Sequence, residues 1–208
     1  MNILRMTGLL VLQVSLVGCF QMSDSVPSVS DNGSLGGEGE DGLQVIDGTS
    51  TAAILASNHV VPSLQTLTGV PASAQTISVF AAKRDIFAYE GDYNSVNAPM
   101  MMSFALVSAE MCNDLVRAEK ALPAASRKFF SDINYGAGPN AVNGTQVGAI
   151  IDRMGMSFWG RSPSVEEKAD ISSTVLGAYM GQTATAQTDL MSVFLCTAML
   201  SSFSTVSF

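Results

Sequence analysis

The spacing of apolar residues after residue 50 constrains the fold of this chain more than any other feature. In several segments apolar side chains return every three or four residues, as one face of an α-helix requires, while the strict alternation of a half-buried strand is scarce. Residues 51–208 are long enough to bury a sizeable core and contain no repeat of fixed period. We therefore predict a single all-α domain of about five to seven helices over residues 51–208.

The clearest of these helices is expected between Asn97 and Leu122. Asn97 is a favourable N-cap, Pro99 suits the first turn, and Pro123 ends the segment. One face of this helix is predicted to be apolar and another polar. The apolar face contains Met101, Phe104, Ala105, Ser108, Cys112, Leu115 and Val116, and the polar face contains Glu110, Asp114, Arg117 and Lys120.

Three further segments have clear helix signals. Pro62 suits the first turn of a short helix that ends at Gly69. An apolar stripe over residues 147–158 predicts a helix that ends at Gly160, and residues 162–167 combine capping residues with acids, as a helix start does. The predicted core-facing side chains are Val147, Ile150, Ile151, Met154 and Phe158 in the first of these two helices, and Val165, Ala169, Ser172, Leu176 and Tyr179 in the second.

The last segment, about residues 184–203, is apolar on nearly every side. Such a helix lies either in the centre of a core or in a membrane. Seven Ser or Thr residues interrupt the uncharged run from Leu190 to Phe208, and no basic residue follows it. This pattern favours a buried core helix.

The N-terminus has the features of a secretory signal peptide. Arg5 supplies the positive charge, and an apolar run from Met6 to Val17 follows it. The run is too short for a membrane-spanning helix. It ends in Leu16-Val17-Gly18-Cys19, which resembles the lipobox of bacterial lipoproteins. The resemblance implies that residues 1–18 are removed as a signal peptide and that Cys19 is lipidated.

Residues 19–50, which begin with the lipidated cysteine, are predicted to be a flexible acidic linker. They contain six acidic residues, six glycines and no Lys or Arg. Their few apolar side chains bury too little surface to offset the cost of ordering. Most of the net charge of −8 belongs to this segment, because residues 51–208 contain 12 acidic and 9 basic residues. We expect no nucleic-acid partner for such a domain.

Cys112 and Cys196 are the two cysteines that remain once Cys19 is assigned to lipid. An exported protein folds in an oxidising compartment, where an even number of cysteines favours disulfides. Both side chains lie on the predicted core-facing sides of their helices. We predict a disulfide between Cys112 and Cys196, and the alternative is two buried free thiols that act as small apolar residues.

The sequence lacks the common catalytic motifs. It contains one histidine, His59, close to the linker, and no nucleophile elbow, P-loop, dinucleotide fingerprint or Cys/His cluster with zinc spacing. We therefore predict no metal, no cofactor and no catalytic residue. Carboxylate chemistry is the alternative, because a carboxylate among apolar residues, such as Glu110, could cleave a glycan.

A distinctive stretch near the C-terminus is Phe158-Trp159-Gly160-Arg161-Ser162-Pro163-Ser164-Val165-Glu166-Glu167, followed later by residues 196–203. Arg161 is predicted to stack on Trp159 or to pair with Glu166. The arrangement is similar to a small helical module of large haem-associated surface proteins of planctomycetes and myxobacteria. The resemblance implies a helical hairpin. The haem attachment signature Cys-x-x-Cys-His is missing, so no electron-transfer role is implied.

These features predict a lipoprotein anchored in the outer membrane through its N-terminal lipid, facing the periplasm or the cell surface. Retention at the inner membrane is typically marked in that family by Asp after the lipidated cysteine, and Phe20 stands there instead. The predicted role is a non-catalytic binding or structural domain for another envelope protein. The alternative is a peptidoglycan-active hydrolase that uses a carboxylate such as Glu110.

Overall fold

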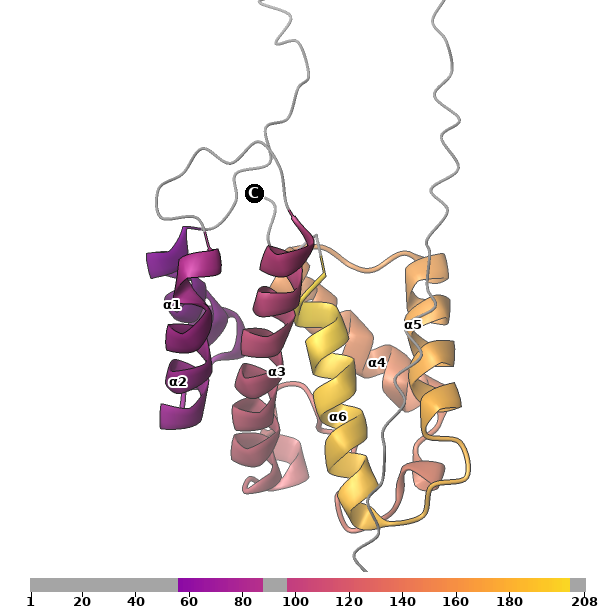
Figure 1. The fold of residues 1–208 in the computed structure, drawn as a ribbon. Coiled ribbons are helices and arrows are strands. Elements are labelled where there is room, and N and C mark those ends of the chain that lie inside the picture. Colours follow the sequence, from indigo (N-terminus) through magenta and orange to yellow (C-terminus); the bar gives the residue numbers. More distant parts are fainter. Residues whose placement is uncertain (1–55, 88–96, 203–208) are drawn as a thin grey trace, which may run out of the picture. The chain divides into compact units, whose positions relative to one another are not determined.

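The periodic segments fold into six α-helices and no strand over residues 56–87 and 97–202, the part of the chain that the computed structural model describes (Figure 1). The predicted all-α fold is therefore confirmed. Short 3₁₀ turns lie at Arg84–Ile86, Ala124–Ser126 and Pro139–Ala141, and a π-helical turn lies at Gly155–Trp159. The helices are α1 (Ser57–Thr68), α2 (Ala74–Lys83), α3 (Ala98–Lys120), α4 (Gly144–Met154), α5 (Val165–Ala178) and α6 (Thr185–Leu200).

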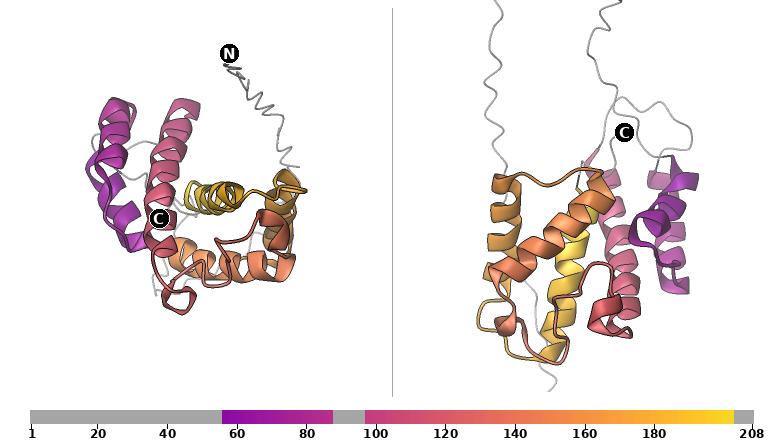
Figure 2. Two further views of the ribbon diagram at one scale, coloured as in Figure 1. Left: turned by 90° about the horizontal axis from the view of Figure 1, so that it is seen from below. Right: turned by 180° about the vertical axis from the view of Figure 1, so that it is seen from behind.

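Helices α3 and α6 form the centre of the fold and lie side by side (Figures 1 and 2). Helices α1 and α2 pack against α3, and α4 crosses behind α6. Helix α5 packs mainly against α4 and has fewer contacts with α6. Helices α5 and α6 run in opposite directions, so residues 165–200 form a helical hairpin (Figure 1).

Helix α3 begins and ends close to the predicted residues. The Asn97 side chain caps it by accepting a hydrogen bond from the Met100 N–H (2.9 Å), and Pro99 lies in the first turn. The prediction that Asp114 lies on the polar face is wrong, because this carboxylate is buried against the start of α2. The predicted apolar face is buried at Phe104, Ser108, Cys112, Leu115 and Val116.

Helix α4 and the π-helical turn after it follow the predicted stripe. Asn143 and Gln146 exchange hydrogen bonds in a capping box at the start of α4. The segment ends at Gly160, which adopts a left-handed conformation (φ 65°) that favours glycine. All five predicted core residues, Val147, Ile150, Ile151, Met154 and Phe158, are buried.

Helix α5 starts as predicted but presents a different face to the core. Ser164 accepts a hydrogen bond from the Glu167 N–H, and the Glu167 carboxylate accepts one from the Ser164 N–H (2.7 Å). The prediction that Val165 and Ala169 face the core is wrong: both are exposed, and Val165 is 80% exposed. Val175 is buried instead, because apolar residues are too sparse on α5 to define one stripe.

Helix α1 starts earlier than predicted. It begins at Ser57, so Pro62 lies inside it rather than in its first turn. The missing N–H of Pro62 removes one hydrogen bond to the carbonyl of Asn58, a loss that a short helix packed on α3 tolerates. The predicted end is confirmed at Gly69, which has a left-handed conformation (φ 78°).

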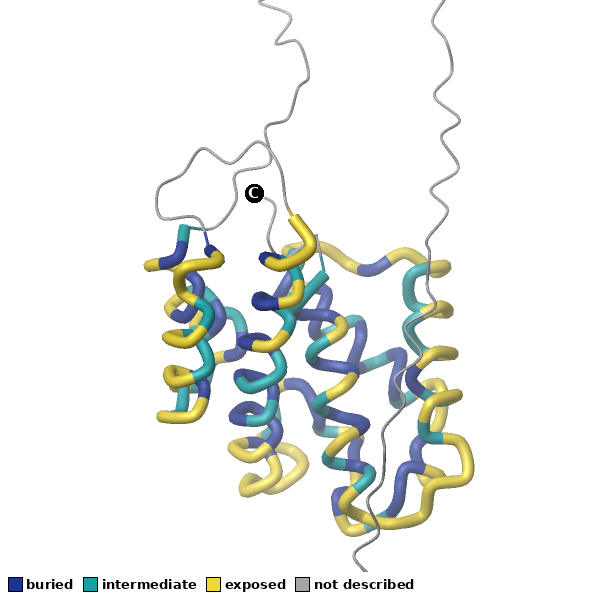
Figure 3. Tube along the Cα trace, in the orientation of Figure 1, coloured by how far each residue is buried: buried dark blue, intermediate teal, exposed yellow. Residues whose placement is uncertain are grey.

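Helix α6 supplies a large share of the core but is not buried on every side. Thr188, Met191, Ser192, Leu195, Cys196, Met199 and Leu200 are buried, while Leu190 and Phe194 are exposed (Figure 3). The prediction of a buried core helix is thus confirmed for the face that carries these seven residues and wrong for the edge at Leu190 and Phe194. Over residues 56–87 and 97–202, no helix is both long and apolar enough to cross a membrane.

Candidate binding surface

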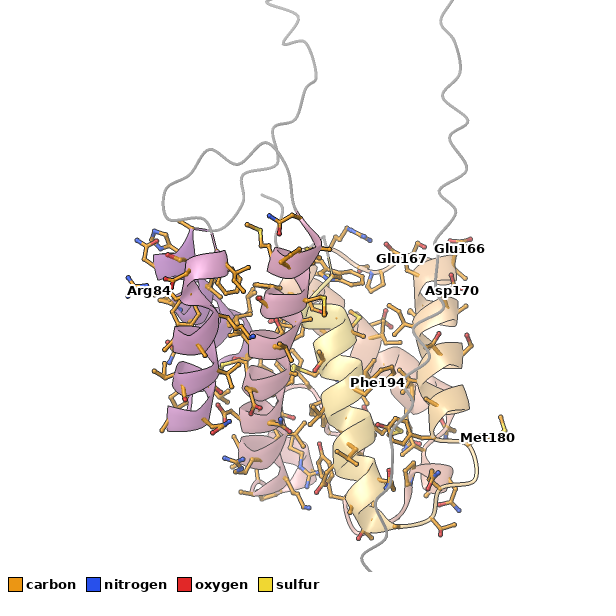
Figure 4. The ribbon with its side chains drawn as sticks, viewed as in Figure 1. Arg84, Glu166, Glu167, Asp170, Met180 and Phe194 are labelled. Atoms are coloured by element: carbon orange, nitrogen blue, oxygen red, sulfur yellow. A yellow bond between two sulfur atoms is a disulfide. The ribbon has the colours of Figure 1, made fainter. Side chains whose placement is uncertain are left out.

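Exposed apolar side chains lie on α6 and at the C-terminal end of α5. Phe194 and Leu190, one turn apart on α6, are 39% and 50% exposed, and Met180, just after α5, is 80% exposed. The ring centroid of Tyr179 lies 6.2 Å from that of Phe194, so the two helices share one aromatic pair. Figure 4 shows Phe194 facing α5 and Met180 at the C-terminal end of that helix. We call Tyr179, Met180, Leu190 and Phe194 the α5–α6 apolar surface.

A hollow of about 270 Å³ deepens this surface at the C-terminal end of α5. One wall comes from the loop before α4, which is held close to the loop before α6: the Asn140 N–H donates to the Gln182 carbonyl (3.3 Å). Gly138 permits this approach, because a Cβ atom there would lie 2.2 Å from the Thr183 carbonyl oxygen. The lining residues are Pro139, Asn140, Val142, Leu176, Tyr179, Met180, Gly181 and Met191.

The position of α5 explains why these side chains remain in water. Lys168 of α5 forms an ion pair with Asp152 of α4 (2.6 Å), and Leu176 lies next to Gly144 at the start of α4. Val175 is the single fully buried side chain among those of α5. Since α5 is drawn toward α4, it does not cover the outer edge of α6.

Acidic residues occupy the N-terminal end of α5 (Figure 4). Arg161 donates two hydrogen bonds to the Glu167 carboxylate (2.8 and 2.7 Å), and its guanidinium lies 5.1 Å from the centre of the Trp159 ring. The predicted stacking on Trp159 is confirmed, but the ionic partner is Glu167 and not Glu166. The hydrogen bonds from Arg161, with the Ser164 N–H, lower the pKa of Glu167 to about 2.

A second hollow, of about 490 Å³, lies beside the π-helical turn. Its cationic side chains already have partners. Lys128 donates to the Leu67 carbonyl (3.2 Å) and to the Ser157 hydroxyl (3.1 Å), and Arg153 donates to the Phe129 carbonyl (2.9 Å). These bonds join α1, the turn after α3 and the π-helical turn. The hollow is lined by Lys128, Phe129, Asp152, Arg153, Met156 and Ser157.

Glu110, the predicted candidate acid, is half-buried on α3. It lines neither hollow and has no hydrogen bond or ion pair with a described residue. The basic residues predicted on the same face pair with acids other than Glu110. Arg117 pairs with Asp114 (3.6 Å), and Lys120 pairs with Asp189 of α6 (2.7 Å). The structure therefore brings no partner to Glu110 that would suit glycan cleavage.

Cys112 and Cys196 are joined in a disulfide between the two central helices. Their Cα atoms are 5.8 Å apart, within the range that a disulfide spans, and both residues are completely buried. The predicted juxtaposition is confirmed. Cys19, the predicted lipidation site, lies outside the described residues.

Two buried carboxylates that sequence reasoning missed hold segments in place. Asp114 accepts hydrogen bonds from the Ser73 N–H (2.8 Å) and the Thr76 hydroxyl (2.6 Å), which ties the start of α2 to α3. Glu119 accepts hydrogen bonds from the backbone N–H groups of residues 128, 129 and 130 (3.1, 2.9 and 2.9 Å). Nothing in the local sequence marks either acid as buried, because their partners lie in other segments.

Within the described ranges, no three His, Cys, Asp or Glu residues come together in a group that could hold a metal ion. No protein family model, no curated protein and no solved structure matches this chain.

Proposed function

We propose that this chain is a lipoprotein of the outer membrane, anchored through Cys19, whose helical domain binds another protein of the cell envelope. The lipobox resemblance of Leu16–Cys19 supports the anchor, and Phe20 supports the outer membrane. The Cys112–Cys196 disulfide is in keeping with an exported protein, because disulfides persist in oxidising compartments.

The α5–α6 apolar surface is the observation that carries the binding role. Each exposed apolar Å² costs about 25 cal/mol relative to burial, so a cluster of large apolar side chains left in water favours association. Aromatic residues and methionine, such as Phe194, Tyr179 and Met180, are enriched in the centres of protein interfaces. The neighbouring hollow gives a partner side chain a place to insert.

Retention of an envelope partner tests the proposal. The full chain, isolated from solubilised envelopes, should retain a partner that is lost when Phe194→Asp places a charge in the surface. Ile77→Asp is the matched control, because Ile77 is an exposed apolar residue on α2. Equal recovery with both variants, or no partner with the unmodified chain, would contradict a binding role for this surface.

A zymogram with purified sacculi tests the hydrolase alternative. The proposal expects no clearing by the purified chain. Clearing that disappears in Glu110→Gln would replace the binding role with peptidoglycan cleavage.

A further inference from the structure

The second hollow, beside the π-helical turn, has the size and the lining of a small-molecule site. Its volume of about 490 Å³ lies within the range of such sites, which are mostly apolar and present a few polar groups. Met156, which is 56% exposed, lies in its wall together with the charged side chains of Lys128 and Arg153. Turns of π-helix are rare and are found frequently at functional sites. This hollow shares no residue with the α5–α6 apolar surface.

The walls of this hollow are fixed by bonds to other parts of the fold. The Ser157 hydroxyl donates to the Leu67 carbonyl of α1 (3.0 Å), and the Trp159 indole N–H donates to a carbonyl of α6 (3.0 Å). The π-helical turn is therefore held against two helices. The opposite wall is held by Arg153, which donates to the Phe129 carbonyl (2.9 Å). Since the walls are already in place, a ligand would not bear the cost of ordering them.

The charges around this hollow do not balance. Arg153 forms an ion pair with Asp132, and Asp152 forms one with Lys168 of α5 (2.6 Å). Lys128 has no ion pair with a described residue, and its two hydrogen bonds go to a carbonyl and a hydroxyl, which are neutral. The charged residues of the lining and their ion-pair partners thus carry three positive charges against two negative ones, which leaves one positive charge over.

The two cations of the lining also have N–H groups to spare. Lys128 uses two of the three N–H groups of its ammonium in bonds to described residues. Arg153 uses its Nε and Nη2 atoms, and no described residue accepts a hydrogen bond from its Nη1 atom. Charge-assisted hydrogen bonds to a carboxylate are roughly twice as strong as bonds between neutral groups. A single negative charge in the hollow would therefore find donors and restore the charge balance.

We propose that the second hollow binds a small apolar molecule with one carboxylate, of the fatty-acid type. The carboxylate accepts hydrogen bonds from Lys128 and Arg153, and its single charge, unlike that of a doubly charged phosphate, matches the one positive charge left over. The hydrocarbon part lies against Met156, whose unbranched and flexible side chain adapts to the shape of a ligand. This role is separate from the proposed binding of an envelope protein, because the two surfaces have no residue in common.

Titration with three eight-carbon compounds tests this inference. Octanoate, octanol and octylammonium share a hydrocarbon chain and differ in charge. Their binding is followed by the NMR signals of the backbone amides in residues 20–208, which retain every described residue. Octanoate should shift the signals of Phe129, Met156 and Ser157 in a saturable way. Octanol should bind about five- to ten-fold more weakly, and octylammonium should cause no saturable shift.

Two variants test the residues of the hollow. Lys128→Met removes the charge, so it should weaken octanoate binding about five- to ten-fold and leave octanol binding within about two-fold. Lys128→Arg keeps the charge and should keep octanoate binding. Met156→Glu, at an exposed position, places a negative charge in the wall and should weaken octanoate binding about ten-fold or more.

Two matched controls lie outside this hollow and should change nothing. Lys83→Met removes another cation that has no ion pair with a described residue. Met180→Glu changes an exposed methionine of the α5–α6 apolar surface.

The outcomes decide for or against the inference. Equal affinity for octanoate and octanol would overturn the carboxylate ligand. Octanoate binding that Met180→Glu weakens as much as Met156→Glu would assign it to the α5–α6 apolar surface and overturn this site. If Lys128→Met loses octanoate and octanol alike, the variant has disturbed the hollow, and octanoate binding that survives Met156→Glu then overturns the inference. No saturable shift up to about 50 mM octanoate would overturn it as well.

Discussion

At the scale of single residues, Glu119 fixes the turn that follows α3. Its carboxylate is buried and accepts three consecutive backbone N–H groups. Glu119→Gln replaces one acceptor oxygen with an NH₂ group that faces those donors. We expect a loss of about 1–3 kcal/mol in the free energy of unfolding, the cost of a buried group without a partner. Urea denaturation, followed by circular dichroism, measures this loss.

Glu110→Gln is the matched control on the same helix. Glu110 has no hydrogen bond to a described residue, so its replacement should change the unfolding free energy by less than about 0.5 kcal/mol. Equal losses for Glu110→Gln and Glu119→Gln would show that the bonds to the turn contribute nothing specific.

Glycine substitutions test the wall of the hollow. In Gly138→Ala the added Cβ would lie 2.2 Å from the Thr183 carbonyl oxygen, so backbone must shift, and we expect a loss of about 1–3 kcal/mol. In Gly177→Ala the Cβ meets nothing within 4 Å, and the replacement should stabilise α5 by about 0.5–1 kcal/mol. Thermal unfolding of the two variants should therefore shift in opposite directions. A shared direction would contradict the close approach at Gly138.

At the level of elements, the stability of the start of α5 should depend on pH, and it should fall as the solution is acidified. Hydrogen bonds from Arg161 lower the pKa of Glu167 from 4.5 to about 2. The contribution of this ion pair to stability is complete above pH 4.5 and is lost as the pH falls toward 2. Both side chains are partly exposed, so solvent screening keeps this contribution small.

NMR titration of the Glu167 side chain provides the direct measurement. Its carboxylate should stay ionised to about pH 2, and Arg161→Ala should return its pKa toward 4.5. Thr174→Ala, an exposed change elsewhere on α5, should leave the titration unchanged. A midpoint near pH 4.5 in the unmodified chain would show that the pair does not form in solution.

The helices differ in how well the sequence predicts their buried faces. The stripe of α4 and the π-helical turn after it is dense and regular, so its five predicted core residues could be identified from spacing alone. Helix α5 has few apolar residues, and its orientation depends on contacts with α4 that lie outside its own sequence. Helix α6 is apolar on nearly every side, so spacing cannot show that its edge at Leu190 and Phe194 stays exposed. The α5–α6 apolar surface could therefore not be predicted from the sequence, because it lies along an edge of α6 that no other described helix covers.

For the whole molecule, the proposed lipid anchor makes a clear prediction. If Cys19 is acylated, Cys19→Ser should block normal maturation and abolish incorporation of a labelled fatty acid. Two acyl chains or more hold a protein stably at a membrane, so the chain should also leave the membrane fraction when the anchor is missing and the signal is cleaved. A Cys112→Ala and Cys196→Ala double variant should still incorporate the label. Full labelling of Cys19→Ser would exclude this residue as the lipidation site.

The disulfide should support the stability of the molecule as a whole, because it joins the two central helices across a separation of 84 residues. Closing a loop of that length is worth about 4–5 kcal/mol in the chain-entropy model, a large part of the 5–15 kcal/mol typical of a domain.

Thiol counting on the denatured, unreduced chain should find no free thiol when Cys19 is acylated and two after reduction. Reduction should lower the Tm by at least about 10 °C. The double variant that lacks Cys112 and Cys196 should melt at the same temperature with and without reductant. Two free thiols before reduction would show that the cysteines lie together without being joined.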